Sequence, residues 1–216
     1  MAARIRIMIR ILFGALVAWL FIGGAAMAVE EPPHTIVEKA ALGQGATFEL
    51  RRYAPKIVAE VTVSGDRREA ANDGFRALAG YIFGDNAPKA KIAMTAPVQQ
   101  SRVKGEKIAM TAPVQQAGHG DQWIVRFVMP KEYTMATLPK PTNPAIRLIE
   151  EPEQTIAAVR FSGTAGDKAL ADKTAALEAA LAARKLTAEG APFYAFYDPP
   201  WTLPFMRRNE VMVGVR

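Results

Sequence analysis

The segment Lys56-Ile57-Val58-Ala59-Glu60-Val61-Thr62-Val63-Ser64-Gly65 decides the fold, because its pattern returns later in the chain. The second segment, Thr155-Ile156-Ala157-Ala158-Val159-Arg160-Phe161-Ser162-Gly163, follows about 98 residues further on, with the alanine, valine and Ser-Gly positions in register. Both segments are rich in β-branched residues and end at a Ser-Gly turn, which is typical of strands. The match predicts an internal duplication.

Each of these strands is expected to lie between another strand and a helix. The preceding strands are predicted at 47–53 and 146–150, and further strands at 123–129, 193–197 and 211–215. Residues 66–83 repeat apolar side chains at helical spacing, and residues 167–185 carry Leu170, Leu177 and Leu181 on one face. We therefore expect an α+β fold, in which two strand-strand-helix units form an antiparallel sheet or barrel with two helices packed outside.

The composition is that of a folded domain. The chain has 216 residues, of which 50% are hydrophobic and 22% charged, and its glycines and prolines are dispersed. These values exclude a disordered, collagen-like or coiled-coil chain. No low-complexity linker divides the sequence, so we expect one compact domain and a monomer.

The first 28 residues have the pattern of a secretory signal peptide. Arg4, Arg6 and Arg10 precede an apolar run from Ile11 to Ala28, which ends in Ala26-Met27-Ala28. A basic start, an apolar centre and a small-residue cleavage site mark such peptides. The alternative is an uncleaved membrane anchor, since the run approaches the length of a spanning helix. In either case we expect an exported domain, in the periplasm or outside the cell.

Net charge and cysteine content narrow the function classes. The formal net charge is +6, but three of the arginines belong to the first 28 residues, so little supports nucleic-acid binding. The chain has no cysteine, which excludes disulfides, thiolate ligands and covalent heme attachment.

A second repeat is identical over its whole length. Residues 91–100 and 107–116 both read Lys-Ile-Ala-Met-Thr-Ala-Pro-Val-Gln-Gln. The expected geometry is a hairpin with the same sequence in both arms, which places Met94 and Met110 on apolar faces. Thioethers bind copper(I), but methionine more often fills gaps in a core, so we predict no metal site.

Three parts of the sequence carry a family resemblance. They are the Lys-Ile-Ala-Met-Thr-Ala-Pro-Val segments, the strand from Trp123 to Pro130, and the ending from Tyr197-Asp198-Pro199-Pro200 to Arg207-Arg208-Asn209-Glu210-Val211. They resemble the SOUL heme-binding protein family, over residues 37–216. The resemblance implies a distorted antiparallel β-barrel flanked by two helices and built from two similar halves. It also implies reversible, noncovalent binding of heme or a related tetrapyrrole in an apolar surface pocket beside the first helix.

Heme is a flat apolar disc with two carboxylates, so its site needs apolar walls and cations. The candidate walls are Phe75, Leu78, Ala79, Ile82, Met94 and Met110, and the candidate contacts for anionic groups are Arg76, Arg207 and Arg208. The walls have an alternative interpretation as ordinary core. The arginines have alternatives too: a solvated helix face, or an ion pair with Glu210 that fixes the final loop.

Axial ligation of the iron is left open. The only two histidines are His34, in the N-terminal tail, and His119, in a turn, so His119 is a weak candidate. Animal members of the family carry an arginine and a lysine on the first helix where this chain has Asn72 and Gly80. The chain departs from the family pattern at both positions.

The sequence also bears on two other function classes. An enzyme is disfavoured, because the sequence contains no H-E-x-x-H, P-loop or G-x-G-x-x-G motif and a Ser-His-Asp triad would need one of the two loop histidines. The alternative to heme binding is an interaction or small-ligand module with the same fold, which the uncharged Asn72 and Gly80 favour.

Overall fold

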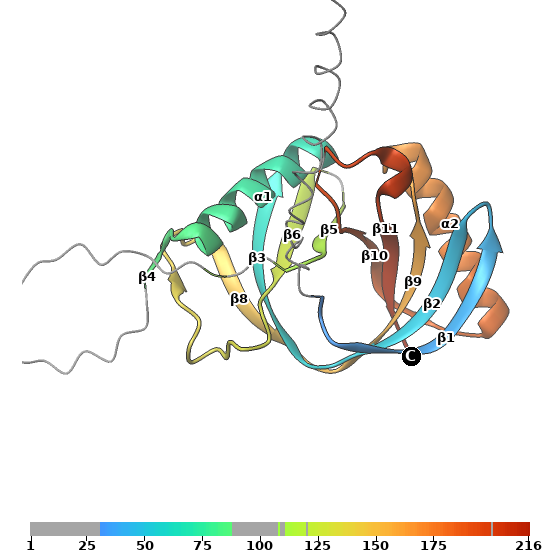
Figure 1. Ribbon diagram of the computed structural model, residues 1–216, viewed down its shortest axis with the longest axis horizontal. Helices are drawn as coiled ribbons and strands as arrows, with labels where there is room; N and C mark the ends of the chain where they lie inside the picture. The colour runs from blue at the N-terminus through green and yellow to red at the C-terminus, as the bar shows by residue number, and fades with distance from the viewer. Residues whose placement is uncertain (1–30, 88–107, 109–110, 120, 200) are drawn as a thin grey trace, which may run out of the picture.

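The computed structural model describes residues 31–87, 108, 111–119, 121–199 and 201–216. These residues form a large antiparallel sheet, a two-stranded ribbon and two α-helices (Figure 1). The large sheet contains β1 (His34–Gly43), β2 (Ala46–Tyr53), β3 (Lys56–Ser64), β5 (Val114–His119), β6 (Gln122–Val128), β8 (Ile146–Glu151), β9 (Gln154–Phe161), β10 (Ala188–Phe196) and β11 (Asn209–Val215). The remaining elements are β4 (Asn86–Ala87) and β7 (Lys140–Pro141) of the ribbon, α1 (Arg67–Phe83), α2 (Asp167–Arg184) and the 3-10 turn η1 (Pro204–Met206).

The strand order agrees with the predicted duplication. The sheet runs β1-β2-β9-β11-β10-β5-β6-β3-β8. Exchanging β2 with β8, β3 with β9, β5 with β10 and β6 with β11 reverses the order of the last eight strands. The first strand of each unit pairs with the second strand of the other unit, β2 with β9 and β8 with β3. The two units are therefore interlocked, and the α+β class is confirmed.

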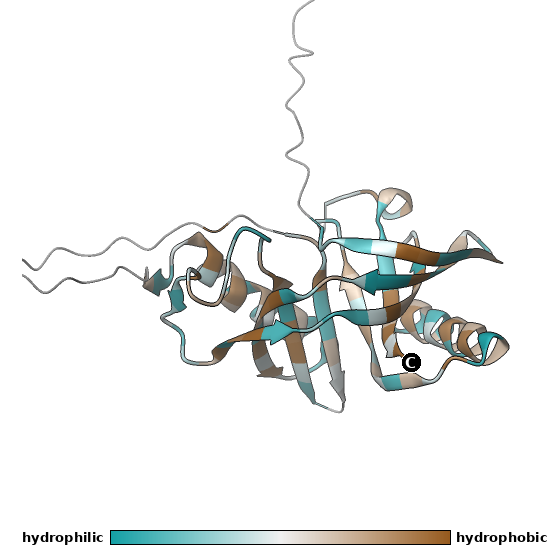
Figure 2. Ribbon diagram, turned by 90° about the horizontal axis from the view of Figure 1, so that it is seen from below, coloured by the Kyte–Doolittle hydropathy of each residue, from teal (hydrophilic) through white to brown (hydrophobic). Residues whose placement is uncertain are grey.

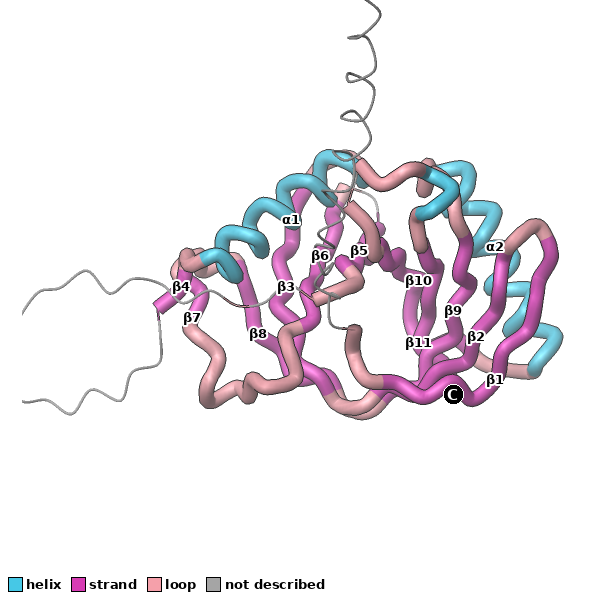
Figure 3. Tube along the Cα trace, in the orientation of Figure 1, coloured by secondary structure: helices cyan, strands magenta, loops and turns pink. Residues whose placement is uncertain are grey.

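The expected closure into a barrel is not confirmed. Among the described residues β1 pairs only with β2 and β8 only with β3, so the sheet has two open edges. The sheet is strongly curved, and both helices lie on its outer side (Figures 1 and 3). Curvature of this kind covers both faces of several strands without closing the hydrogen-bond ladder.

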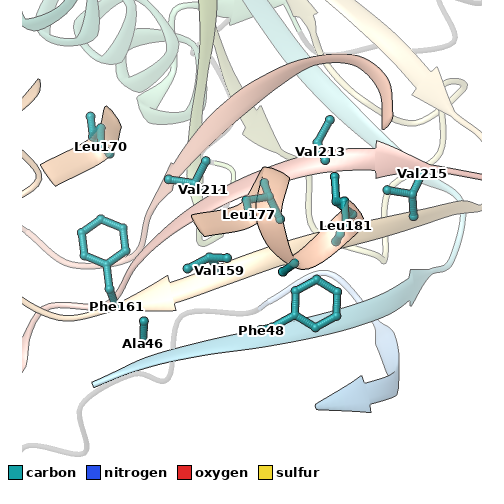
Figure 4. Packing of buried hydrophobic residues seen from close by; sticks show 12 residues of the cluster. Ala46, Phe48, Val159, Phe161, Leu170, Leu177, Leu181, Val211, Val213 and Val215 are labelled. Atoms are coloured by element: carbon teal, nitrogen blue, oxygen red, sulfur yellow. The ribbon is translucent and has the colours of Figure 1, made fainter. Parts of the chain in front are cut away.

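Each helix covers its own half of the sheet. Hydrophilic and hydrophobic stretches both occur along the strands (Figure 2), and each helix packs against apolar side chains of its own half. Beneath α1, the side chains of Leu78, Tyr81 and Ile82 pack against strand residues Ala59, Val61, Val125 and Phe127. Beneath α2, the side chains of Leu170, Leu177 and Leu181 pack against strand residues Phe48, Val159, Val211 and Val213 (Figure 4). Neither helix in the described part of the chain has the length and apolar content needed to cross a bilayer.

Capping residues fix the position of α1. The carboxylate of Asp66 accepts hydrogen bonds from the backbone N–H groups of Arg68 and Glu69 at 2.8 and 2.9 Å, which satisfies donors that the first turn leaves unpaired. At the other end Gly84 has a φ of 126°, a conformation that residues with a side chain rarely adopt. The predicted helix over 66–83 therefore matches α1 within one residue.

α1 lies against β6 without room for a side chain at its middle. A Cβ atom built on Gly74 would lie 2.4 Å from Cγ2 of Val125. We expect Gly74→Ala to lower the free energy of unfolding by about 1–3 kcal/mol, because the helix must move away from the strand. Urea denaturation measures this loss. Asn72→Ala, on the exposed side of the same helix, is the control and should not destabilise the domain. An unchanged midpoint for Gly74→Ala would contradict this packing.

Candidate functional site

The outer face of α1 presents an apolar stripe to solvent. We define the stripe as Phe75, Ala79 and Phe83, which are spaced by four residues and therefore lie on one side of the helix. Phe75 is 40% exposed and Phe83 59%, whereas Ala79 is half-buried. The edge of the Phe75 ring contacts Phe127, with ring centroids 5.4 Å apart. The stripe is thus anchored to the core at one end and open along its length.

Two of the predicted wall residues lie on the opposite side of α1. Leu78 is 0% exposed and Ile82 1%, and both pack against the sheet. A ligand on the helix surface would not touch them, so the structure places them in the core. Helical spacing alone assigns Leu78, Ile82 and Phe75 to one broad apolar face, but α1 has apolar residues on two sides.

Cations flank the apolar stripe. Arg68 and Asn72 are exposed and occupy the same side of α1, about two turns and one turn before the stripe, respectively. The side chain of Arg76 is 80% exposed and pairs with Asp73 at 3.1 Å, one turn back. Such exposed pairs are weak, so the guanidinium of Arg76 is available to an anion on the surface.

The other two candidate cations are already engaged. Arg208 donates from Nε to Glu210 at 2.9 Å and from Nη1 to Glu31 at 2.8 Å, and its guanidinium lies 3.7 Å above the Tyr197 ring. Arg207 donates from Nε to the carbonyl of Thr202 at 2.7 Å. The alternative interpretation, an arginine that pairs with Glu210 to fix the final loop, describes Arg208.

A buried charge cluster around Arg51 and Glu210 was not predicted from the sequence. Arg51 is fully buried and donates from both Nη atoms to the two carboxylate oxygens of Glu210, at 2.7 and 2.8 Å. It also donates to Glu49, and its Nη1 to the hydroxyl of Tyr53. Because β9 lies between β2 and β11, this pair ties two non-adjacent strands together.

The cluster keeps its carboxylates ionised. Burial by itself raises the pKa of Glu210, but the hydrogen bonds and charges of Arg51 and Arg208 outweigh it and hold that pKa below its ordinary value. The pKa of Glu49 is lowered in the same way, by Lys39 and Arg51 against the effect of burial. Burial raises the pKa of Tyr197, whose hydroxyl donates to Glu210 at 2.8 Å. The cluster is a structural lock rather than a catalytic group, since every oxygen of Glu210 is occupied.

Neither histidine belongs to α1, which carries the apolar stripe. His34 begins β1, and its ring is tilted by 36° against the ring of Tyr53, with ring centroids 4.8 Å apart. His119 ends β5 at a turn in which the carbonyl of Asp121 accepts a hydrogen bond from the backbone N–H of Gly65, just before α1. Among the described residues, no group of three or more histidine, aspartate or glutamate side chains is arranged to hold a metal ion. Met94 and Met110 lie outside the described residues.

A cavity of about 580 Å³ opens elsewhere in the molecule. It lies between the N-terminal residues 31–33, the turns at Pro55 and Pro152, and the segment after β6. Lys56 lines it and pairs with Glu151 at 2.7 Å. None of the described wall candidates borders this cavity.

The fold defines a class of duplicated α+β domains with two helices on one side of a curved sheet. Within that class the chain belongs to the SOUL heme-binding protein family, whose sequence profile matches residues 29–214. Heme-binding protein 1 of Xenopus laevis is 28% identical over 168 residues, covering 77% of this chain and 83% of that protein. Heme-binding protein 2 of Mus musculus is 27% identical over 174 residues, covering 78% of each.

Other relatives match over a shorter stretch or in fold alone. Heme-binding protein 2 of Homo sapiens is 43% identical over 75 residues, so this chain spans only 36% of that protein. The crystal structure of the EcmrR C-terminal domain has a TM-score of 0.57 at 10% identity and covers 79% of this chain and 98% of that chain. At such low identity the likeness concerns the fold only.

Proposed function

We propose that this chain is an exported protein that binds heme or a related tetrapyrrole noncovalently on the outer face of α1. The apolar stripe carries the proposal: two phenylalanine rings on one helix side are 40% and 59% exposed, where an ordinary surface helix is polar. From Phe75 to Phe83 the helix advances about 12 Å, which suits one face of a flat macrocycle. The family membership and the heme-binding relatives support the ligand class.

The flanking side chains suit the rest of the ligand. Arg76 lies within a turn of the stripe and Arg68 about two turns before Phe75, and both would bind the propionate carboxylates, in place of the absent cations at Asn72 and Gly80. Apolar contact and charge pairing hold a macrocycle without a bond to iron. We therefore propose a weak, exchangeable ligand and a binding protein rather than an enzyme.

Titration with hemin tests this proposal. Residues 29–216, which contain every described element of the fold, should shift the Soret band of hemin on binding. The shift should persist in His34→Ala and His119→Ala, because neither histidine belongs to the apolar stripe. An unchanged Soret band would reject heme binding, and a loss of binding in either histidine variant would reject binding without an axial ligand.

The cavity supports a second candidate function, binding of a small ligand other than heme. Its volume of about 580 Å³ is in the range of small-molecule sites, and it is independent of α1. Thr134→Trp would narrow the cavity and leave the apolar stripe intact. If hemin binding were retained in Phe75→Asp and lost in Thr134→Trp, the heme site would be the cavity and not the apolar stripe.

A further inference from the structure

The loop before β11 exposes large apolar side chains in a group. We define the apolar tip as Trp201, Leu203, Phe205 and Met206, which are 82%, 55%, 73% and 63% exposed. Four such residues within six positions are unusual on a soluble surface, where single exposed apolar residues are the norm. The apolar tip is separate from the apolar stripe in the sequence, and its side chains find no place in any of the three core clusters.

The tip is an ordered turn rather than a frayed loop. The backbone N–H of Gly163 donates to the carbonyl of Pro204 at 2.8 Å, so the β9–α2 turn supports the tip from below. Arg207 donates from Nε to the carbonyl of Thr202 at 2.7 Å and closes the loop across its base. The fold therefore holds the loop in one conformation while its apolar side chains remain exposed.

The composition of the tip matches a membrane interface. Tryptophan and phenylalanine favour the boundary between lipid headgroups and acyl chains, and a neighbouring arginine interacts with anionic headgroups. Arg207 directly follows the tip in the chain. Arg67, at the start of α1, lies beside the same supporting turn, where it donates to the carbonyl of Ala165 at 3.2 Å and pairs with Asp167 at 2.6 Å.

The first described residues of the chain lie next to the base of the tip. The apolar run ends at Ala28, and Glu31 forms an ion pair with Arg208 at 2.8 Å, two residues after Met206. Three residues of chain span at most about 10 Å. If the N-terminal segment is retained as an anchor, the base of the tip would therefore lie close to the bilayer.

We propose that the apolar tip docks the domain on an anionic lipid bilayer by inserting Trp201, Phe205 and Met206 into its interface. The proposal rests on the exported location and is independent of heme binding. Where the N-terminal segment is retained as an anchor, the tip adds a second membrane contact.

Trp201 itself reports the docking. In residues 29–216 the variant Trp123→Phe retains Trp201 as its single tryptophan. With vesicles containing phosphatidylglycerol we expect its emission to shift to the blue and the protein to sediment with the lipid. The double change Phe205→Ser and Met206→Ser should lower the bound fraction about tenfold or more, whereas Val37→Ser, at an exposed apolar position on β1, should leave it unchanged.

Three results would overturn the proposal. Equal sedimentation of the tip variant and the parent would show that the tip does not bind lipid. A blue shift without vesicles that grows with protein concentration would assign the tip to a second copy of the chain. Quenching of Trp201 by hemin, with no response to vesicles, would assign the tip to the heme site.

Discussion

Phe75→Asp should abolish or strongly weaken hemin binding in a domain that stays folded, whereas Leu78→Asp, three residues along the same helix, should unfold it. The Phe75 ring is 40% exposed, so a carboxylate there is hydrated and repels the propionates. Leu78 is 0% exposed, and a buried, unpaired charge costs several kcal/mol, comparable to the whole stability of a domain. We expect the Kd for hemin to rise at least about tenfold in Phe75→Asp.

Circular dichroism melting and hemin titration measure the two effects separately. Phe75→Leu keeps an apolar side chain and should retain most of the binding. Leu177→Asp in α2, also 0% exposed, should unfold the domain as Leu78→Asp does, without any specific effect on ligand. If Phe75→Asp binds hemin like the wild type, or Leu78→Asp melts like the wild type, the division of α1 into a core side and a ligand side is wrong.

Arg51→Met should lower the free energy of unfolding by about 3–5 kcal/mol, because it leaves the buried carboxylate of Glu210 without its two-pronged partner. Arg76→Met removes the same side chain from an exposed pair and should leave stability unchanged within error. Urea denaturation compares the two. The double change Arg51→Met and Glu210→Leu should cost less than the sum of the single changes, since it removes both charges of the pair.

The same cluster predicts how stability depends on pH. The pKa of Glu210 is lower in the folded domain than in the unfolded chain, where it is near 4.5. Its contribution to stability is therefore fully present above about pH 4.5 and is lost as the pH falls through the folded value. Glu210→Gln should flatten the decline of stability in that acidic range. A wild-type stability that stays constant from neutral pH down through the acidic range, or a loss of stability in Arg76→Met equal to that in Arg51→Met, would contradict the role of the cluster.

Local sequence patterns were sufficient for most of the fold. Alternation and the Ser-Gly turns located β3 and β9, and helical spacing located α1 and α2 to within a residue at most ends. What the pattern did not contain was the pairing between units, β2 with β9 and β8 with β3, because hydrogen-bond partners leave no periodic signal. Closure of the sheet was inferred from the family and not from the residues.

The candidate site was predicted only in part. The periodicity of α1 predicts an apolar helix but does not say which apolar side meets the sheet, so it groups Leu78 with Phe75. The cluster of Arg51 and Glu210 was missed because a polar strand face is normally assigned to solvent. One signal was present: Glu210 stands beside the apolar run Val211-Met212-Val213, where a charge is retained only with a buried partner.

Recovery of bound ligand from cells tests the central claim most directly. Residues 29–216 and the Phe75→Asp variant would be purified in parallel from cells supplied with a heme precursor, and the ligand would be identified by its Soret absorbance and by mass spectrometry. The account predicts a tetrapyrrole with the wild-type domain and a large reduction with the variant at equal yield of folded protein. A wild-type domain without any tetrapyrrole, or equal amounts of ligand on both proteins, would contradict it.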